Sequence, residues 1–67
     1  MTIGESIRKI RKERGLSASQ LSIKSKVPYH SVYAWESGKC FPSLMNLISI
    51  ADALDVSLDE LVGRSRG

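Results

Sequence analysis

The sequence predicts an all-α domain built from five short helices. No run alternates apolar and polar residues for long enough to indicate a strand, three Ser/Thr-x-x-Glu/Gln boxes mark helix starts, and glycines follow stretches whose apolar residues recur every three or four positions. At 67 residues the chain has room for one domain. We expect that domain at residues 1–63 and a polar tail at 64–67.

The first helix is predicted to start after Thr2. Thr2-x-x-Glu5 is a capping box, in which a hydroxyl and a carboxylate each satisfy a backbone N–H. Arg14 extends the apolar stripe of this helix, Arg11 lies beside that stripe, and Gly15 is expected to end the helix in a left-handed conformation. The stripe itself is formed by Ile3, Ile7 and Ile10, and the outer face is covered by Arg8, Lys9 and Lys12.

The second helix is predicted from a further capping box, Ser17-x-x-Gln20, with Leu21 as its main apolar anchor. It should stop near Ser25-Lys26, which leaves a very short turn before the next helix. Two helices joined by such a tight turn form a helix-turn-helix, here at about residues 17–37.

The third helix is predicted to open with Pro28, whose missing N–H costs nothing in a first turn, and to end at Gly38. Helical spacing puts Val32 and Trp35 on one side, where they can pack in the core. The other side presents Tyr29, His30, Tyr33, Ala34 and Ser37.

The fourth helix is predicted to open at Pro42-Ser43 and to be central to the core, because apolar residues cover a wide arc of it. Its expected core stripe consists of Leu44, Leu47, Ile48, Ala51 and Leu54. A third capping box, Ser57-x-x-Glu60, opens a fifth helix that Gly63 should end. A dimer interface is expected at apolar residues without a clear place in the core, which are Phe41, Met45, Leu58 and Val62.

Charge and composition restrict the function. Residues 1–39 hold eight Lys/Arg against three acidic residues, whereas residues 40–67 hold two against four. A basic half suggests nucleic acid as a partner, and a solvated helix face is the alternative. One His and one Cys, Cys40, make neither an internal disulfide nor a closed zinc site, and a passive thiol is the expected state of that cysteine.

Other classes of function find no support in the sequence. We expect no enzyme and no cofactor, because no nucleophile–base set, carboxylate pair or phosphate-cradling glycine loop is evident. No apolar stretch reaches the roughly 20 residues of a membrane helix, and the first residues lack the apolar region of a signal peptide. A cytoplasmic protein that binds neither metal nor membrane is therefore expected.

Several short motifs are specific in combination. They are Gly15-Leu16-Ser17, Leu21, Val27, Val32, Trp35-Glu36-Ser37-Gly38-Lys39, Pro42-Ser43, Leu47, Ile50-Ala51, Leu54, Val56-Ser57, Leu58 and Leu61. With these residues, from position 3 to 62, the chain resembles the phage-repressor type of helix-turn-helix domain, the Cro/repressor or xenobiotic-response-element family. The resemblance implies a lambda-repressor-like fold and a bacterial or phage-encoded transcriptional regulator. Such a regulator would bind double-stranded DNA sequence-specifically, as a repressor, in the form of a homodimer on a palindromic operator.

The resemblance also implies roles for single residues. Arg11 would form an ion pair with Glu36 and so join the first helix to the third, the recognition helix. Base contacts would come from Tyr29, His30, Tyr33 and Ala34. Phosphate contacts are expected at helix termini and the following loop, from Ala18, Ser19, Ser37, Gly38, Lys39 and Ser43.

The sequence departs from the family pattern at positions that matter for binding. The family usually has a glutamine where Ala18 stands and often a glycine where Lys26 stands. A left-handed Lys26 would cost roughly 1–2 kcal/mol. No Arg, Asn or Gln lies on the outer side of the recognition helix, so the strongest bidentate base contacts are missing. This favours an alternative function, a protein-interaction or antitoxin-type module with weak or non-specific DNA binding and a regulatory protein partner.

Overall fold

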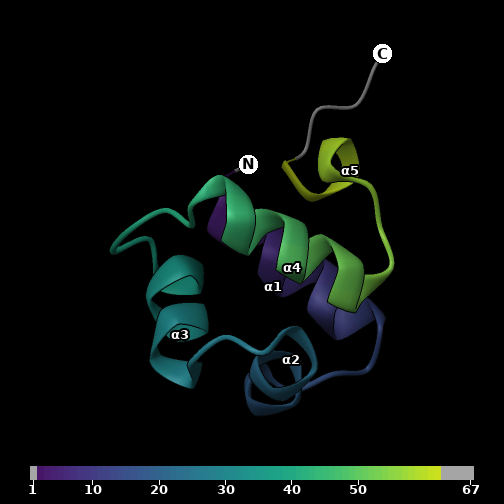
Figure 1. The fold of residues 1–67 in the computed structure, drawn as a ribbon, viewed down its shortest axis with the longest axis horizontal. Coiled ribbons are helices and arrows are strands. Elements are labelled where there is room, and N and C mark those ends of the chain that lie inside the picture. The colour runs from purple at the N-terminus through teal and green to yellow at the C-terminus, as the bar shows by residue number, and fades with distance from the viewer. Residues whose placement is uncertain (1, 63–67) are drawn as a thin grey trace.

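The computed structural model describes residues 2–62, and its five helices confirm the predicted all-α class for this part of the chain (Figure 1). The helices are α1 (Ile3–Glu13), α2 (Ala18–Ser25), α3 (Tyr29–Ser37), α4 (Leu44–Leu54) and α5 (Leu58–Val62). The predicted tail at 64–67 and the predicted helix end at Gly63 lie outside the described residues. None of the described helices combines the length and the apolar character that crossing a membrane requires.

The three capping boxes predicted from the sequence are all present. In each box the Ser or Thr hydroxyl accepts a hydrogen bond from the backbone N–H three residues later, at 3.1 Å. The Glu or Gln side chain accepts one from the N–H of the capping residue, at 2.8–3.0 Å. These reciprocal bonds satisfy donors that a helix N-terminus otherwise leaves unpaired, so local sequence sets the starts of α1, α2 and α5.

Left-handed residues end the first three helices. Gly15 follows α1 with φ of 73°, and Gly38 caps α3 with φ of 83°, as predicted. Lys26 caps α2 with φ of 62°, a conformation that costs a non-glycine residue roughly 1–2 kcal/mol. Pro28 differs slightly from expectation, because it is the extended N-cap residue of α3 and the helix itself begins at Tyr29.

All five helices contribute to one hydrophobic core. α1 packs on α3 and α5, α2 packs on α3 and α4, and α4 packs on α5. In Figure 1, α4 lies in front of α1, while α2 is seen end-on beside α3, so the α2 and α3 axes are far from parallel. The largest fully buried side chains are Ile7, Leu21, Val32, Ile50, Leu54 and Leu61.

The buried face of α4 differs from the predicted stripe. Ala51 and Leu54 are buried as expected, but Leu44 is 64% exposed and Ile48 is also exposed. Ile50 and Ala53 take the inward positions instead. Because α4 is apolar around most of its circumference, its periodicity does not specify which face meets the core.

Gly4 allows α1 to approach α3 closely. A Cβ atom at Gly4 would overlap the carbonyl oxygen of Trp35 and lie close to the Cα of Glu36. The start of α1 therefore lies directly against the last turn of α3. This contact helps to fix the position of α3, and no sequence pattern predicted it.

Candidate nucleic-acid interface

The Arg11 side chain joins α1 to α3. Its Nε and Nη2 atoms donate to the two carboxylate oxygens of Glu36, at 2.7 and 3.0 Å. Its Nη1 atom donates to the carbonyl oxygen of Leu16, at 2.9 Å. The Arg11 and Glu36 side chains are each only 11% exposed. The guanidinium therefore connects three segments: α1, the loop before α2 and the last turn of α3.

The charge on Arg11 is secured by its partner. The hydrogen bond with Glu36 raises the pKa of Arg11, and the nearby Glu36 and Tyr29 side chains add to this effect, while burial opposes it. The resemblance implied the pairing with Glu36, but it did not indicate the Leu16 carbonyl. Every residue has a backbone carbonyl, so a pattern of side chains cannot predict that the Leu16 carbonyl accepts from Arg11; this bond is known only from the folded structure.

The outer side of α3 carries the residues expected to contact bases. Tyr29 and Tyr33 are 51% and 56% exposed, His30 is exposed, and Ala34 is half-buried. Val32 and Trp35, on the opposite side, are buried in the core. The helix thus presents an aromatic face of hydroxyl and imidazole groups while its other face holds it in place.

The residues expected to contact phosphates fall into two groups. Ala18 and Ser19 form the first turn of α2, where backbone N–H groups have no acceptor within the helix. The second group ends α3, continues through the following loop to the start of α4, and is exposed: Ser37, Gly38, Lys39 and Ser43. Two of the hydroxyls in this group already form hydrogen bonds, since Ser37 donates to the Ala34 carbonyl at 3.2 Å and Ser43 accepts from the Asn46 N–H at 3.3 Å.

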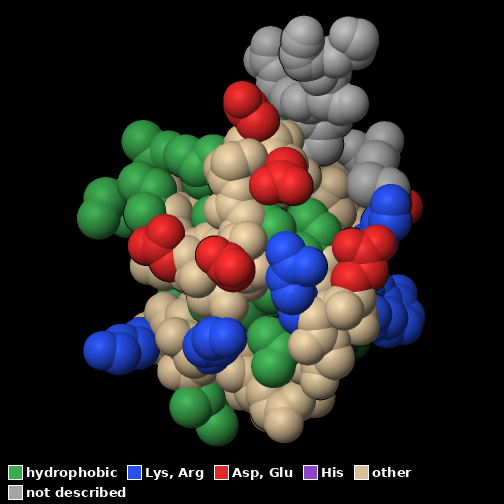
Figure 2. Space-filling view, turned by 90° about the vertical axis from the view of Figure 1, so that its right-hand side faces the viewer, with side chains coloured by type: hydrophobic (Ala, Val, Ile, Leu, Met, Phe, Trp, Pro, Cys, Tyr) green, Lys and Arg blue, Asp and Glu red, His purple; other side chains and the backbone are tan. Residues whose placement is uncertain are grey.

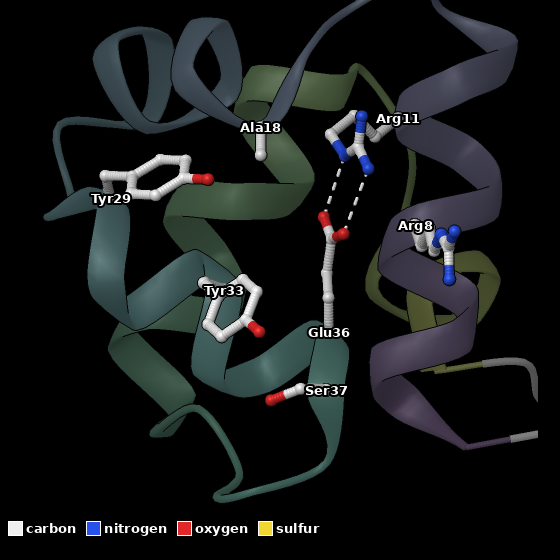
Figure 3. Close-up of a pocket in the computed structure, with 7 residues that line it drawn as sticks. All are labelled: Arg8, Arg11, Ala18, Tyr29, Tyr33, Glu36 and Ser37. Carbon is white, nitrogen blue, oxygen red and sulfur yellow. Dashed lines mark hydrogen bonds and ion pairs between the residues drawn. The ribbon is translucent and has the colours of Figure 1, made fainter.

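A pocket of about 390 Å³ lies between α1, α2 and α3 (Figure 3). In Figure 3 the Arg11–Glu36 pair occupies the centre, with Tyr29 and Tyr33 on one side and Arg8 on the other. The pocket brings together two expected base contacts, two expected phosphate contacts and the ion pair. Its lining residues are Arg8, Arg11, Ala18, Tyr29, Tyr33, Glu36 and Ser37. The sequence placed Arg8 only on a basic outer face, because nothing in its spacing links it to α3.

The residues expected at a dimer interface are exposed to different degrees. Phe41 and Met45 are 78% and 71% exposed, Leu58 is 37% exposed, and Val62 is half-buried. Leu44 and Ile48, which were expected in the core, share one exposed face of α4 with Met45, and Phe41 is exposed in the loop that precedes α4. Figure 2 shows hydrophobic side chains gathered at its left, the side that faces the viewer in Figure 1, where α4 is foremost.

Known proteins share both the sequence and the fold of this chain. A family model described as helix-turn-helix matches residues 7–61. The CTXphi transcriptional repressor RstR of Vibrio cholerae is 38% identical over 64 residues, which are 96% of this chain and 57% of that protein. The chain spans about half the length of the curated relatives it matches.

Two solved structures that contain DNA or an operator have the same fold. The biofilm regulator SinR in complex with DNA gives a TM-score of 0.86 at 34% identity, over 90% of this chain and 97% of that one. The P22 c2 repressor in complex with a synthetic operator gives a TM-score of 0.87 at 28% identity, over 97% of this chain and 98% of that one. Both similarities extend over the five-helix arrangement described above.

Proposed function

The chain belongs to the helix-turn-helix family, and on that premise we propose that it is a transcriptional regulator that binds double-stranded DNA through α3. Its relatives and structural neighbours include repressors and a regulator in complex with DNA, which supports this function. The observation that carries the proposal is the exposed aromatic face of α3. The Arg11–Glu36 pair holds the helix itself against α1, so that this face stays directed outward. A major groove about 12 Å wide admits one helix presented in this way.

The proposed contacts follow from the position of each group. His30 can donate to or accept from purine edges, and Ala34 can contact only a thymine methyl. Tyr29 and Tyr33 lie beside them and add aromatic contact area. Positive charge near phosphates comes from Lys39, and free backbone N–H groups come from Ala18 and Ser19 at the start of α2. The other proposed phosphate contacts are Ser37 at the end of α3, Gly38 directly after it and Ser43 before α4; the Gly38 N–H already donates to the Trp35 carbonyl at 3.2 Å.

We further propose that the regulator is a repressor that acts as a homodimer on a palindromic operator. The exposed apolar face formed by Phe41, Leu44, Met45 and Ile48 gives the second copy a surface to cover. The proposal also assigns Leu58 and Val62 of α5 to this interface, in line with the expectation from the sequence. Two copies related by a two-fold axis would place their α3 helices in successive major grooves, about 34 Å apart.

Selection of duplexes from a random pool, followed by titration across a range of salt concentrations, tests this function. We expect one preferred sequence with two inverted half-sites and an affinity that falls steeply with salt, because phosphate contacts release counterions. A two-to-one ratio of protein to duplex would support the dimer. If no duplex bound even at low salt, the proposal that DNA is the ligand would be refuted.

A protein-interaction module with weak or non-specific DNA binding is the second candidate. Two observations favour it: the apolar face at Phe41 and Met45 is exposed, and the outer side of α3 carries no Arg, Asn or Gln. The same titration separates the two functions. A module of this kind would bind duplexes of any sequence with similar affinity, whereas the proposed regulator discriminates among them.

A further inference from the structure

We propose that the outer side of α3 identifies its operator by the C5-methyl groups of pyrimidines, with the methyl group of Ala34 and the ring of Tyr33 as the contacting surfaces. Thymine and 5-methylcytosine would both be accepted, whereas cytosine and uracil, which lack this methyl group, would be bound more weakly. The inference rests on the proposed function and deepens it, because it names the chemical group in the major groove on which the choice of sequence depends.

The outer side of α3 has few groups that can recognise a base by hydrogen bonds. It carries no Arg, Asn or Gln, which are the side chains that form paired hydrogen bonds with purine edges. The hydroxyl of Ser37 already donates to the Ala34 carbonyl at 3.2 Å, so it offers a base only its oxygen atom. What remains are the single hydroxyls of two tyrosines and the imidazole of His30. Hydrogen bonds alone therefore give this face little power to discriminate among base pairs.

Glu36 is not available for the recognition of cytosine. A glutamate in the major groove can accept from the N4 amino group of cytosine. Both carboxylate oxygens of Glu36 instead accept from Arg11, at 2.7 and 3.0 Å, and Figure 3 shows the carboxylate directed towards that guanidinium. Glu36 is the only acidic residue of α3, so the helix offers an unmethylated cytosine no acidic partner.

The apolar part of this face is a better match for methyl groups. Tyr33 is 56% exposed, and Ala34 next to it is half-buried and has no polar atom in its side chain. Thymine presents its C5-methyl group in the major groove, where cytosine presents an N4 amino group and a bare C5–H. Because the burial of a methyl group against apolar surface is favourable, this surface gains more from a methylated pyrimidine than from an unmethylated one.

Ala34 is the point of its stripe at which α3 can approach the bases most closely. It lies one turn after His30 and one turn before Ser37, so the three residues share one stripe of the helix. The side chain of Ala34 is the shortest of the three. A pyrimidine methyl group at this point would contact the Ala34 methyl directly, and the longer, exposed Tyr33 side chain would cover its flank.

Uracil substitution tests the proposal, because it removes the C5-methyl group of a thymine and leaves every hydrogen-bonding group in place. The duplex is the preferred operator from the random-pool selection. Uracil at a contacted position should weaken binding about fourfold, the value of one buried methyl group, and about fifteenfold when both half-sites are changed. Uracil outside the half-sites is the control and should leave the affinity unchanged.

Two outcomes of this experiment would overturn the proposal. One is a change of less than about twofold when every thymine of both half-sites is replaced by uracil, because even a single buried methyl group is worth more. The other is a preferred operator whose half-sites contain no thymine.

Variants of α3 assign the methyl contact to single residues. The readout is the ratio of the affinities for the thymine and uracil operators, which a general loss of protein stability does not change. Ala34→Gly and Tyr33→Ser should each abolish the preference for thymine at one position, because each removes apolar surface. Tyr33→Phe should keep the preference, since the ring stays, and His30→Ala should weaken binding without altering the ratio. Unchanged ratios in both Ala34→Gly and Tyr33→Ser would overturn the assignment.

5-Methylcytosine separates the methyl group from the rest of the thymine base. At a contacted position, replacement of T·A by C·G should weaken binding, and methylation of that cytosine should strengthen it again about fourfold. Equal affinities for the two cytosine duplexes would overturn the proposal. If no duplex bound at all, the proposed function would fail together with this inference. If a preferred operator were bound regardless of its methyl groups, only the methyl recognition would be wrong.

Discussion

Removal of one partner from the Arg11–Glu36 pair should destabilise the whole domain. Arg11→Met deletes two charge-assisted hydrogen bonds and leaves a carboxylate that is 11% exposed without its counterion. Breaking pairs of this kind costs about 3–5 kcal/mol, and the residual exposure of both side chains favours the lower end, about 3 kcal/mol. A domain of this size has about 3–10 kcal/mol of unfolding free energy in total. We therefore expect Tm to fall by about 12–24 °C.

A double-mutant cycle separates the pair from its surroundings. In Arg11→Met with Glu36→Leu both charges are gone, so most of the loss should be recovered and the double variant should be about 2 kcal/mol more stable than Arg11→Met alone. Recovery should remain incomplete by about 1 kcal/mol, because the Leu16 carbonyl loses its 2.9 Å donor in both Arg11 variants. Urea unfolding followed by Trp35 fluorescence measures each corner of the cycle.

The same cycle contains the result that would refute this reasoning. If each single variant cost less than about 1 kcal/mol and the two effects were additive, the pair would behave as an ordinary surface ion pair. A pH series provides a control. Because Glu36 raises the pKa of Arg11, the stability that Arg11 contributes is fully present below its unfolded-state pKa. It is lost only as pH rises through the higher folded-state pKa, so no loss is expected between neutral and mildly alkaline pH.

Three further predictions concern the backbone and the apolar face. Lys26→Gly should raise the unfolding free energy by about 1 kcal/mol in urea titrations, because glycine adopts the left-handed conformation without strain, and any destabilisation would contradict this. Gly4→Ala should lower the unfolding free energy by at least about 2 kcal/mol, because the added methyl group would overlap the Trp35 carbonyl. Alanine normally stabilises a helix relative to glycine, so a gain in stability would disprove the close approach of α1 to α3. Phe41→Ser combined with Met45→Ser should convert dimers into monomers in sedimentation experiments. The control Ile23→Ser changes an equally exposed apolar residue on α2 and should leave the dimer intact. A dimer that persists in the double variant would exclude Phe41 and Met45 from the interface.

Much of the fold could be predicted because its signals are local. Each capping box involves atoms within four consecutive residues, and the glycines that end α1 and α3 act through their own backbone angles. The two sides of α3 were also correctly separated, since Val32 and Trp35 differ sharply in polarity from His30 and Tyr33. Such features need no knowledge of the rest of the chain.

The orientation of α4 could not be predicted in the same way. Leu44, Ile48, Ile50 and Ala53 are all apolar, so any of several faces could meet the core with similar burial of apolar surface. The choice depends on how α2 and α5 pack against α4, which is decided by shape and volume over the whole core. As a result, Leu44 and Ile48, which the periodicity assigned to the core, lie on the exposed apolar face of α4.

The sequence by itself determined the starts of α1, α2 and α5, the glycines that end α1 and α3, the two sides of α3 and, through the resemblance, the choice of Glu36 as the partner of Arg11. Only the tertiary structure decided that Gly4 lets α1 meet α3, that the Leu16 carbonyl completes the hydrogen bonds of Arg11, and that Arg8 shares a pocket with two tyrosines. The physical reason is the range of the interactions. Caps and periodicity act within one or two helical turns, whereas these contacts join segments whose separation in space depends on every packed side chain between them.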